Sequence, residues 1–136
     1  MATAALSDTC FAIIKTYVVA SGEVVTEGRA VQFAGADDQA QIANGAGEKS
    51  FGVALTSGTA GQQVQVGMLG HAIYRVKVGT GGATRGEFAI LAADGYTNQT
   101  LGGGNTVRYI SGMFLQTGVV GDMVGMMVGA FASGSA

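Results

Sequence analysis

The sequence of 136 residues predicts an all-β protein. Residues 63–68 and 73–78 alternate apolar and polar side chains with the period of two that a half-buried strand requires. Short runs of this kind are separated by glycine-bearing turns at a spacing of about 8–12 residues, as in β-sandwiches and barrels. No segment keeps a helical apolar period with capping residues. The 24 glycines, in a chain without proline, are therefore expected mainly in tight turns.

The first strands are predicted from a local turn signal. Tyr17-Val18-Val19 and Glu23-Val24-Val25 flank Ser21 and Gly22, a pair typical of a hairpin turn. Of the six methionines, four stand at positions 113, 123, 126 and 127. Because methionine is unbranched and flexible, these four predict an adaptable apolar surface or core in the C-terminal part of the chain.

An internal repeat organises the chain. Residues 52–61 and 112–121 both read G-x-x-L-x-x-G-x-x-G, and 25–28 matches 83–86. We therefore predict an N-terminal arm over 1–14 and a single β domain over 15–136, built from two modules at about 15–70 and 73–130. The repeated glycines are predicted to be structural turn residues: Gly28, Gly52, Gly58, Gly61, Gly86, Gly112, Gly118 and Gly121.

Residues 112–132 could be taken for a membrane helix, because they carry one charge and three glycines at GxxxG spacing. The matching first-copy segment, 52–72, contains Gln62, Gln63 and Gln65 and has the pattern of a strand. Since two copies of one module share a conformation, we predict buried β-structure for 112–132.

Composition excludes several classes of protein. Charged residues make up 12% of the chain and the net charge is −2, so no basic surface for nucleic acid or an anionic membrane is expected. The single cysteine, Cys10, excludes an internal disulfide framework. The first eight residues lack the basic start and apolar stretch of a signal peptide, so we expect a protein made and used without export.

No catalytic constellation is predicted, and we expect neither an enzyme nor a cofactor or metal. His71 is the only histidine and has no metal-ligand spacing around it. A nucleophile–base pair of Cys10 with His71 is a distant alternative. The glycine-rich run 79–87 lacks the Lys-Ser/Thr of a phosphate loop and is predicted to be a turn before a strand. Asp37 and Asp38 are predicted to lie in a solvated loop.

The chain resembles the small capsid decoration (cement) proteins of tailed bacteriophages. The resemblance runs from Tyr17 onward and rests on short motifs: Val25-Thr26-x-Gly28, Ser50-Phe51-Gly52-Val53-Ala54-Leu55 followed by Gly58, Gly61 and Val64-x-Val66, and the second-copy motifs around Gly86 and Gly112. It implies a β-barrel-like or β-tulip-like protein that sits as a homotrimer on the outer capsid surface of the virion. There it would bridge neighbouring major capsid protein subunits and stabilise the expanded head, after assembly in the host cytoplasm.

Proteins of this family often reach the shell with an extended N-terminal arm, and the resemblance assigns capsid binding to this part of the chain. The residues expected to contact the capsid are Ala2, Thr3, Leu6, Asp8 and Phe11. Leu6 and Phe11 would be the apolar anchors of an arm that orders on binding or adds a strand to a capsid sheet.

Two other functions are compatible with the sequence. One is another phage structural part, a head fibre or a tail component. The other is a small β-barrel that binds a sugar or other small ligand, although the chain has no tryptophan and its four tyrosines are scattered.

Overall fold

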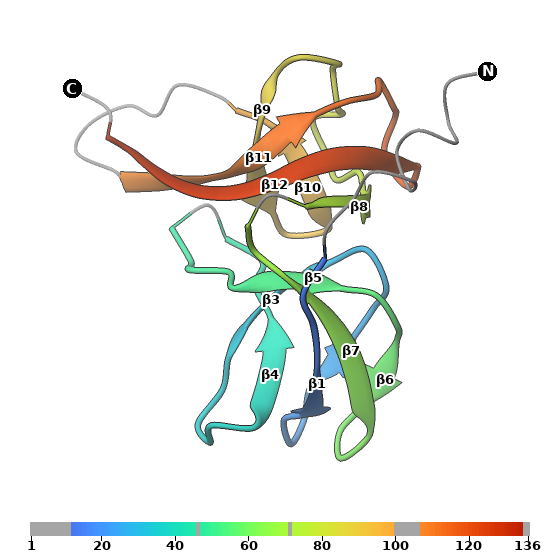
Figure 1. Ribbon diagram of the computed structural model, residues 1–136. Helices are drawn as coiled ribbons and strands as arrows, with labels where there is room; N and C mark the ends of the chain where they lie inside the picture. The colour runs from blue at the N-terminus through green and yellow to red at the C-terminus, as the bar shows by residue number, and fades with distance from the viewer. Residues whose placement is uncertain (1–11, 46, 71, 100–106, 135–136) are drawn as a thin grey trace.

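The computed structural model describes residues 12–45, 47–70, 72–99 and 107–134, and these contain strands and turns but no helix. They form two modules, one above the other (Figure 1). The prediction of an all-β protein with a small barrel is confirmed. The first module comprises β1 (Ile14–Val19), β2 (Val24–Val25), β3 (Ala30–Phe33), β4 (Gln39–Ile42), β5 (Gly52–Ala54), β6 (Gly58–Thr59) and β7 (Gln63–Met68). The second comprises β8 (Ile73–Lys77), β9 (Phe88–Ala92), β10 (Gly95–Asn98), β11 (Val107–Phe114) and β12 (Met123–Gly134).

The first module is a closed barrel with the strand order β1-β4-β3-β5-β7. All its ladders are antiparallel except the one between β1 and β4, which pairs Val18 with Gln39 and Val19 with Ala40. The hairpin expected around Ser21 and Gly22 is wrong. The chain does turn there, but β1 pairs with β4 and β7 while β2 pairs with β6, because a turn signal does not specify which strands pair.

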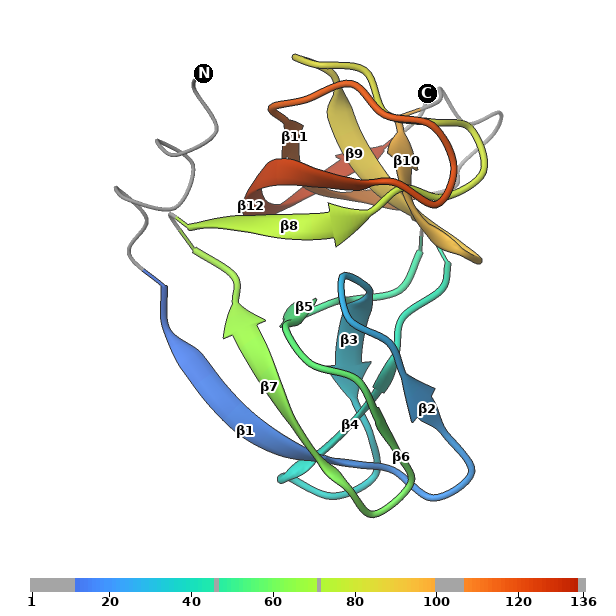
Figure 2. The same ribbon diagram turned by 90° about the vertical axis from the view of Figure 1, so that its right-hand side faces the viewer.

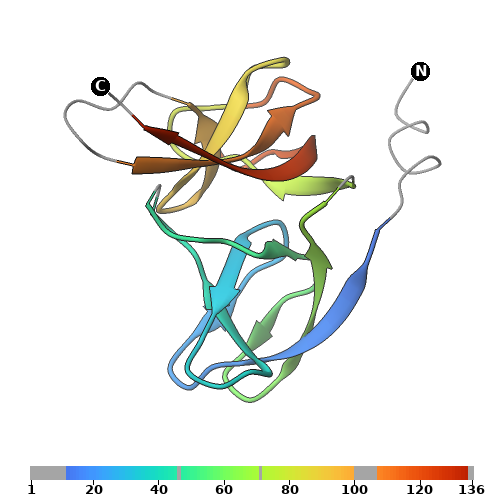
Figure 3. The ribbon, with the colours of Figure 1, turned by 60° about the vertical axis from the view of Figure 1, so that its left-hand side comes forward.

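The second module repeats this order in a more open form. Its sheet has the strand order β10-β9-β11-β12-β8. A single parallel bridge between Val78, just after β8, and Tyr96 of β10 joins the two edges of the sheet. A bridge between Ala83 and Gly118 takes the place of the β2–β6 pair. β11 and β12 form a long two-stranded ribbon that runs beyond the rest of the sheet (Figure 3).

Residues that match in the repeated motif make matching backbone hydrogen bonds. The pairs that correspond are Gly28 N to Ala54 O and Gly86 N to Phe114 O, both 2.8 Å, and Gly61 N to Val19 O at 2.9 Å and Gly121 N to Val78 O at 2.8 Å. The matched residues therefore hold equivalent places in the two modules, and any position of one module can be compared with its counterpart in the other.

The eight repeated glycines divide into two groups. Gly28, Gly61, Gly86 and Gly121 have φ between +83° and +92°, a left-handed conformation that glycine adopts without strain. The other four differ from the expectation of turn residues: Gly52, Gly58 and Gly112 lie in β5, β6 and β11, and Gly118 lies in a bridge. A Cβ at any of these four would crowd a facing backbone or valine, so close approach explains the glycine there.

The core has two parts, and one of them joins the modules. The first fills the closed barrel and contains Tyr17, Val19, Val25, Val31, Ala40, Ala54, Val64 and Val66. The second contains Ala30, Ala43 and Val53 from the outside of the first module together with the inward side chains of the second, among them Tyr96, Phe114 and Met126. The open barrel of the second module is thus packed against the outer wall of the first (Figure 2).

Polar contacts reinforce this junction. The Lys77 N–H on β8 donates to Gly28 O at 2.9 Å, and the Arg29 guanidinium donates to Ala93 O at 2.8 Å. The Tyr74 ring lies so close above Gly67 that a Cβ at Gly67 would overlap it. Close packing and specific hydrogen bonds of this kind indicate a fixed junction between the modules.

The segment 112–132 consists of strand and turn residues, as predicted from the repeat. In the parts of the chain that the structure describes, no helix is long and apolar enough to span a membrane.

Candidate functional surfaces

The predicted capsid-binding residues Ala2, Thr3, Leu6, Asp8 and Phe11 lie outside the described residues, as do Cys10 and His71. The capsid-binding assignment and the distant Cys10–His71 alternative therefore stay predictions. The described chain begins at residue 12, beside the end of β7, where Ile13 O accepts a hydrogen bond of 2.8 Å from Met68 N.

The polar groups singled out in the sequence are placed as follows. Asp37 and Asp38 are exposed in the turn between β3 and β4. The glycine-rich run 79–87 leads into strand β9, as expected of a turn before a strand. Among residues 12–45, 47–70, 72–99 and 107–134, no three His, Cys, Asp or Glu side chains gather as metal ligands would.

One carboxylate has a built hydrogen-bond environment at the turn between β9 and β10. The Thr80 hydroxyl donates to Asp94 Oδ2 at 2.6 Å and the Thr80 N–H donates to Asp94 Oδ1 at 2.8 Å. These bonds favour the ionised form and hold the pKa of Asp94 below its usual value. The neighbouring Arg29 is partly buried, and desolvation lowers the pKa of its guanidinium. The Arg29 bond to Ala93 O, next to Asp94, fastens the turn to the first module.

Tyr96 is a fully buried phenol between the modules. Its side chain is 1% exposed and its hydroxyl forms a hydrogen bond with the Ser50 side chain of the first module. Burial raises the pKa of Tyr96 well above its ordinary value, because a phenolate would lose its hydration there.

This burial predicts an alkaline loss of stability that involves Tyr96. The unfolded chain releases the phenol proton near pH 10 while the folded chain retains it, so stability from this group is full below pH 10 and falls as pH rises further. We expect the urea midpoint of the wild type to fall between pH 9 and pH 11, and to fall less in Tyr96→Phe. Tyr109→Phe, which removes a partly buried tyrosine of β11, is the control. An equal fall in wild type and Tyr96→Phe would contradict the prediction.

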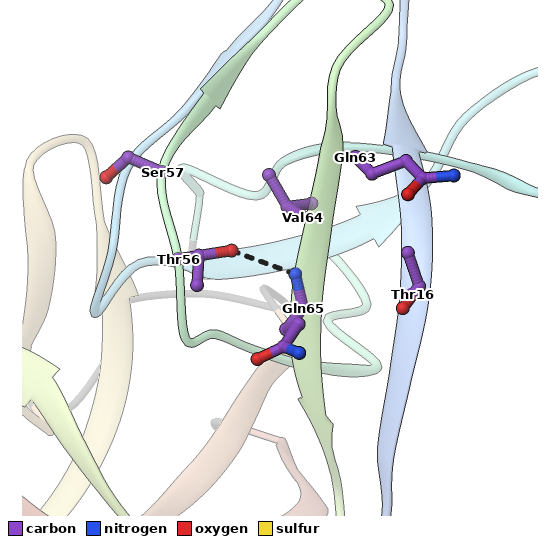
Figure 4. Close-up of a pocket in the computed structure, with 6 residues that line it drawn as sticks. All are labelled: Thr16, Thr56, Ser57, Gln63, Val64 and Gln65. Carbon is purple, nitrogen blue, oxygen red and sulfur yellow. Dashed lines mark hydrogen bonds between the residues drawn. The ribbon is translucent and has the colours of Figure 1, made fainter.

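A shallow polar groove crosses the outside of the first barrel (Figure 4). It has a volume of about 420 Å³ and is lined by Thr16, Thr56, Ser57, Gln63, Val64 and Gln65. Thr56 Oγ1 accepts the Gln65 N–H at 2.9 Å, which fixes the wall of the groove. Hydroxyl and amide groups of this kind bind neutral polar groups, and the lining contains neither a charged nor an aromatic side chain that would select a ligand class.

Three aromatic rings gather at one end of the first barrel. Phe33 stacks on Phe51 with ring centroids 4.0 Å apart, and Phe51 lies 4.9 Å from Tyr17. Tyr17 is buried, but Phe33 is 55% exposed, and so is Ile13, at 70%. Ile13 is bonded through its backbone to Met68, which pairs with Gly52 next to Phe51, and we call Ile13, Phe33 and Phe51 the barrel rim. Exposed apolar side chains that cluster in this way indicate a contact surface rather than a solvated face.

A second apolar surface lies across the outer face of the second module. Phe88 pairs with Met113, Met113 with Met127 and Met127 with Ile73, so four strands contribute one unbroken row. Phe88 and Met127 are 44% and 47% exposed. We call these four residues the outer row. The four clustered methionines predict an adaptable apolar surface or core here, and the structure provides both, since Met126 is fully buried in the core.

The sequence contains no signal from which the outer row could be assembled. Phe88 and Ile73 are far from Met113 and Met127 along the chain, and only the register of the strands makes them neighbours. The barrel rim was likewise missed, because Phe33 and Phe51 come together only when the barrel closes.

Comparison with known proteins finds a likeness in structure but none in sequence. No protein-family model matches the sequence, and no curated protein matches it. Among solved structures, the chain is similar to the N base of the head fibre protein gp8.5 of bacteriophage phi29, with a TM-score of 0.65 and 16% sequence identity. The match covers 87% of this chain and 94% of the other. At this identity the likeness shows a shared fold over most of both chains.

Proposed function

We propose that this chain is a structural protein of a bacteriophage particle, carried on the outer surface of the head. Its role is to decorate and stabilise the expanded capsid by bridging neighbouring major capsid protein subunits, as a homotrimer and without enzymatic activity. A protein that binds only the assembled shell stabilises the shell by mass action, and the effect is multiplied over many sites.

The observation that carries this proposal is the fold likeness to the base of a phage head fibre, which spans most of both chains. It agrees with the resemblance of the sequence motifs to capsid decoration proteins. The two exposed apolar surfaces, the barrel rim and the outer row, add physical support, because such surfaces on a small protein are typical of protein–protein contacts.

A head-fibre base is the second candidate. It is favoured by the same likeness, since the matched phi29 protein is itself the base of a head fibre. The two candidates differ in copy number: a decoration protein occupies the lattice of the shell, whereas a fibre is present in fewer copies.

Sedimentation of phage particles through a density gradient, with quantification by mass spectrometry, tests the proposal. We expect the chain to migrate with the particles in amounts close to those of the major capsid protein. A copy number far below that value would favour the head fibre. A chain that stays at the top of the gradient with small soluble proteins would overturn the virion assignment.

A deletion variant tests whether the N-terminal arm, rather than the barrel, binds the capsid. A variant lacking residues 2–11 is added to heads that lack the protein, and we expect it to stay unbound while it melts like the full chain. This expectation follows from the proposed role of Leu6 and Phe11 as anchors, and from the start of β1 at Ile14, beyond the deletion. Unchanged binding would refute the assignment of capsid binding to the arm.

A further inference from the structure

The outer row has an equivalent row in the first module. There the second module covers most of the row. In the first module the equivalent row is Ala30, Val53, Gly67 and Ile14, which pair across β3, β5, β7 and β1. Ala30 and Val53 belong to the core shared between the modules, and Gly67 lies beneath the Tyr74 ring. The fourth member, Ile14, is 51% exposed. The fold therefore already uses three of the four positions of this row as a docking surface for another module.

Two equivalent glycines, each two residues before the first residue of its row, show that one face is covered and the other is open. Gly28 and Gly86 have nearly the same φ, +83° and +88°. A Cβ at Gly28 would meet Met123 at 2.7 Å and Lys77 N at 2.9 Å, both from the second module. A Cβ at Gly86 would meet nothing within 4 Å. The second module thus presents the same face with no module on it.

Two residues of the barrel rim are counterparts of residues in the core between the modules. Ile13 matches Ala72, because Met68 N donates to Ile13 O as Val128 N donates to Ala72 O. Phe33 matches Leu91 in the same alignment of β3 with β9. Ala72 and Leu91 are buried in the shared core, whereas Ile13 and Phe33 are exposed. Together with Phe88 and Met127, they account for half of the eight exposed large apolar side chains among the described residues.

We propose that the outer row of one copy docks on the barrel rim of a second copy, so that chains associate head to tail. Within each chain the second module packs on the first. In the proposed contact, the first module of one copy packs on the second module of the next copy. A head-to-tail interface uses two different surfaces, and it closes into a ring when the rotation between copies allows it. The methionines of the outer row suit this role, because flexible thioether side chains adapt to a facing surface.

The contact between copies differs from the internal junction at one point. Inside the chain, Lys77 N donates to Gly28 O across the junction. The equivalent donor in the first module, Val18 N, is already bonded to Asp38 O, in the turn just before β4, at 2.8 Å. The second copy therefore docks through side chains, with Phe88, Met113 and Met127 against Ile13, Phe33 and Phe51, and without that backbone bond.

Sedimentation velocity of the purified full chain tests this inference without the phage particle, so its outcome is independent of the proposed virion role. The wild type is expected to associate as its concentration rises. Met127→Glu and Phe33→Glu should each weaken association by about 30-fold or more, because a charge then enters an apolar contact. Val119→Glu, at a turn residue that is 71% exposed and outside both surfaces, should associate like the wild type.

Mixing the two weakened variants gives the decisive measurement. Met127→Glu keeps an intact barrel rim and Phe33→Glu keeps an intact outer row, so an equimolar mixture should form a dimer of twice the 13.6 kDa chain mass and nothing larger. A symmetric contact of either surface with itself would give no such rescue. A mixture that stays monomeric, a wild type that stays monomeric at all concentrations, or normal association of Met127→Glu would each overturn the inference.

Discussion

Phe114→Ala is expected to lower the free energy of unfolding by about 3–5 kcal/mol, the usual result of emptying a fully buried aromatic site. Phe114 is completely buried in the core that contains Ala30 and Val53 of the first module as well as the strands of the second. Because this core joins the modules, both should unfold in one transition. Urea titration followed by circular dichroism, with hydrogen exchange at amides of each module, measures the free energy and the number of transitions.

Phe33→Ala is the matched control for this substitution. It removes the same side chain from a position that is 55% exposed, so the loss should be limited to the stack on Phe51, about 0.5–1.5 kcal/mol. If Phe114→Ala unfolded the second module while amides of the first stayed protected from exchange, the modules would be independent and the single-unit description of the core would be wrong.

Gly28→Ala should destabilise the chain by about 1–3 kcal/mol more than Gly86→Ala, the usual cost of overpacking. Both substitutions force alanine into a left-handed conformation, which costs about 1–2 kcal/mol at each site. Only at Gly28 does the new Cβ also meet Lys77 N and Met123 across the junction. The difference between the two variants therefore isolates the contact between modules from backbone strain.

The measurement is the urea midpoint of each variant, at protein concentrations low enough to keep the chain monomeric. Equal losses at the two glycines would mean that the junction yields to a methyl group at no cost, which would contradict the close packing described for it. A substantially larger loss for Gly86→Ala would mean that its face is covered by something other than solvent.

The fold class could be predicted from the sequence because it depends on local patterns. The alternation over 63–68 predicted β7 with its observed bounds, and the alternation that begins at Ile73 predicted β8. Pairing could not be predicted in the same way. The turn at Ser21 and Gly22 was read correctly as a turn, yet its flanking strands pair with β4, β7 and β6, which are distant in the sequence.

The candidate surfaces depended still less on local signals. The outer row exists because the register places Met113 between Phe88 and Met127, and a shift of one residue in any strand would turn its side chain to the other face. The arm residues, by contrast, follow from a resemblance and lie outside the described residues, and the deletion of residues 2–11 tests their role.

The second module shares its core with the first, and this has a consequence for biosynthesis. Every strand of the closed first barrel lies within residues 14–68, so its ladders can be completed before the remainder of the chain has left the ribosome. The second module includes Ala30, Ala43 and Val53 in its core, and these belong to the part that is made first. Vectorial synthesis thus supplies the later half with a finished template on which to fold, and the order of the modules along the chain matches the order in which they are needed.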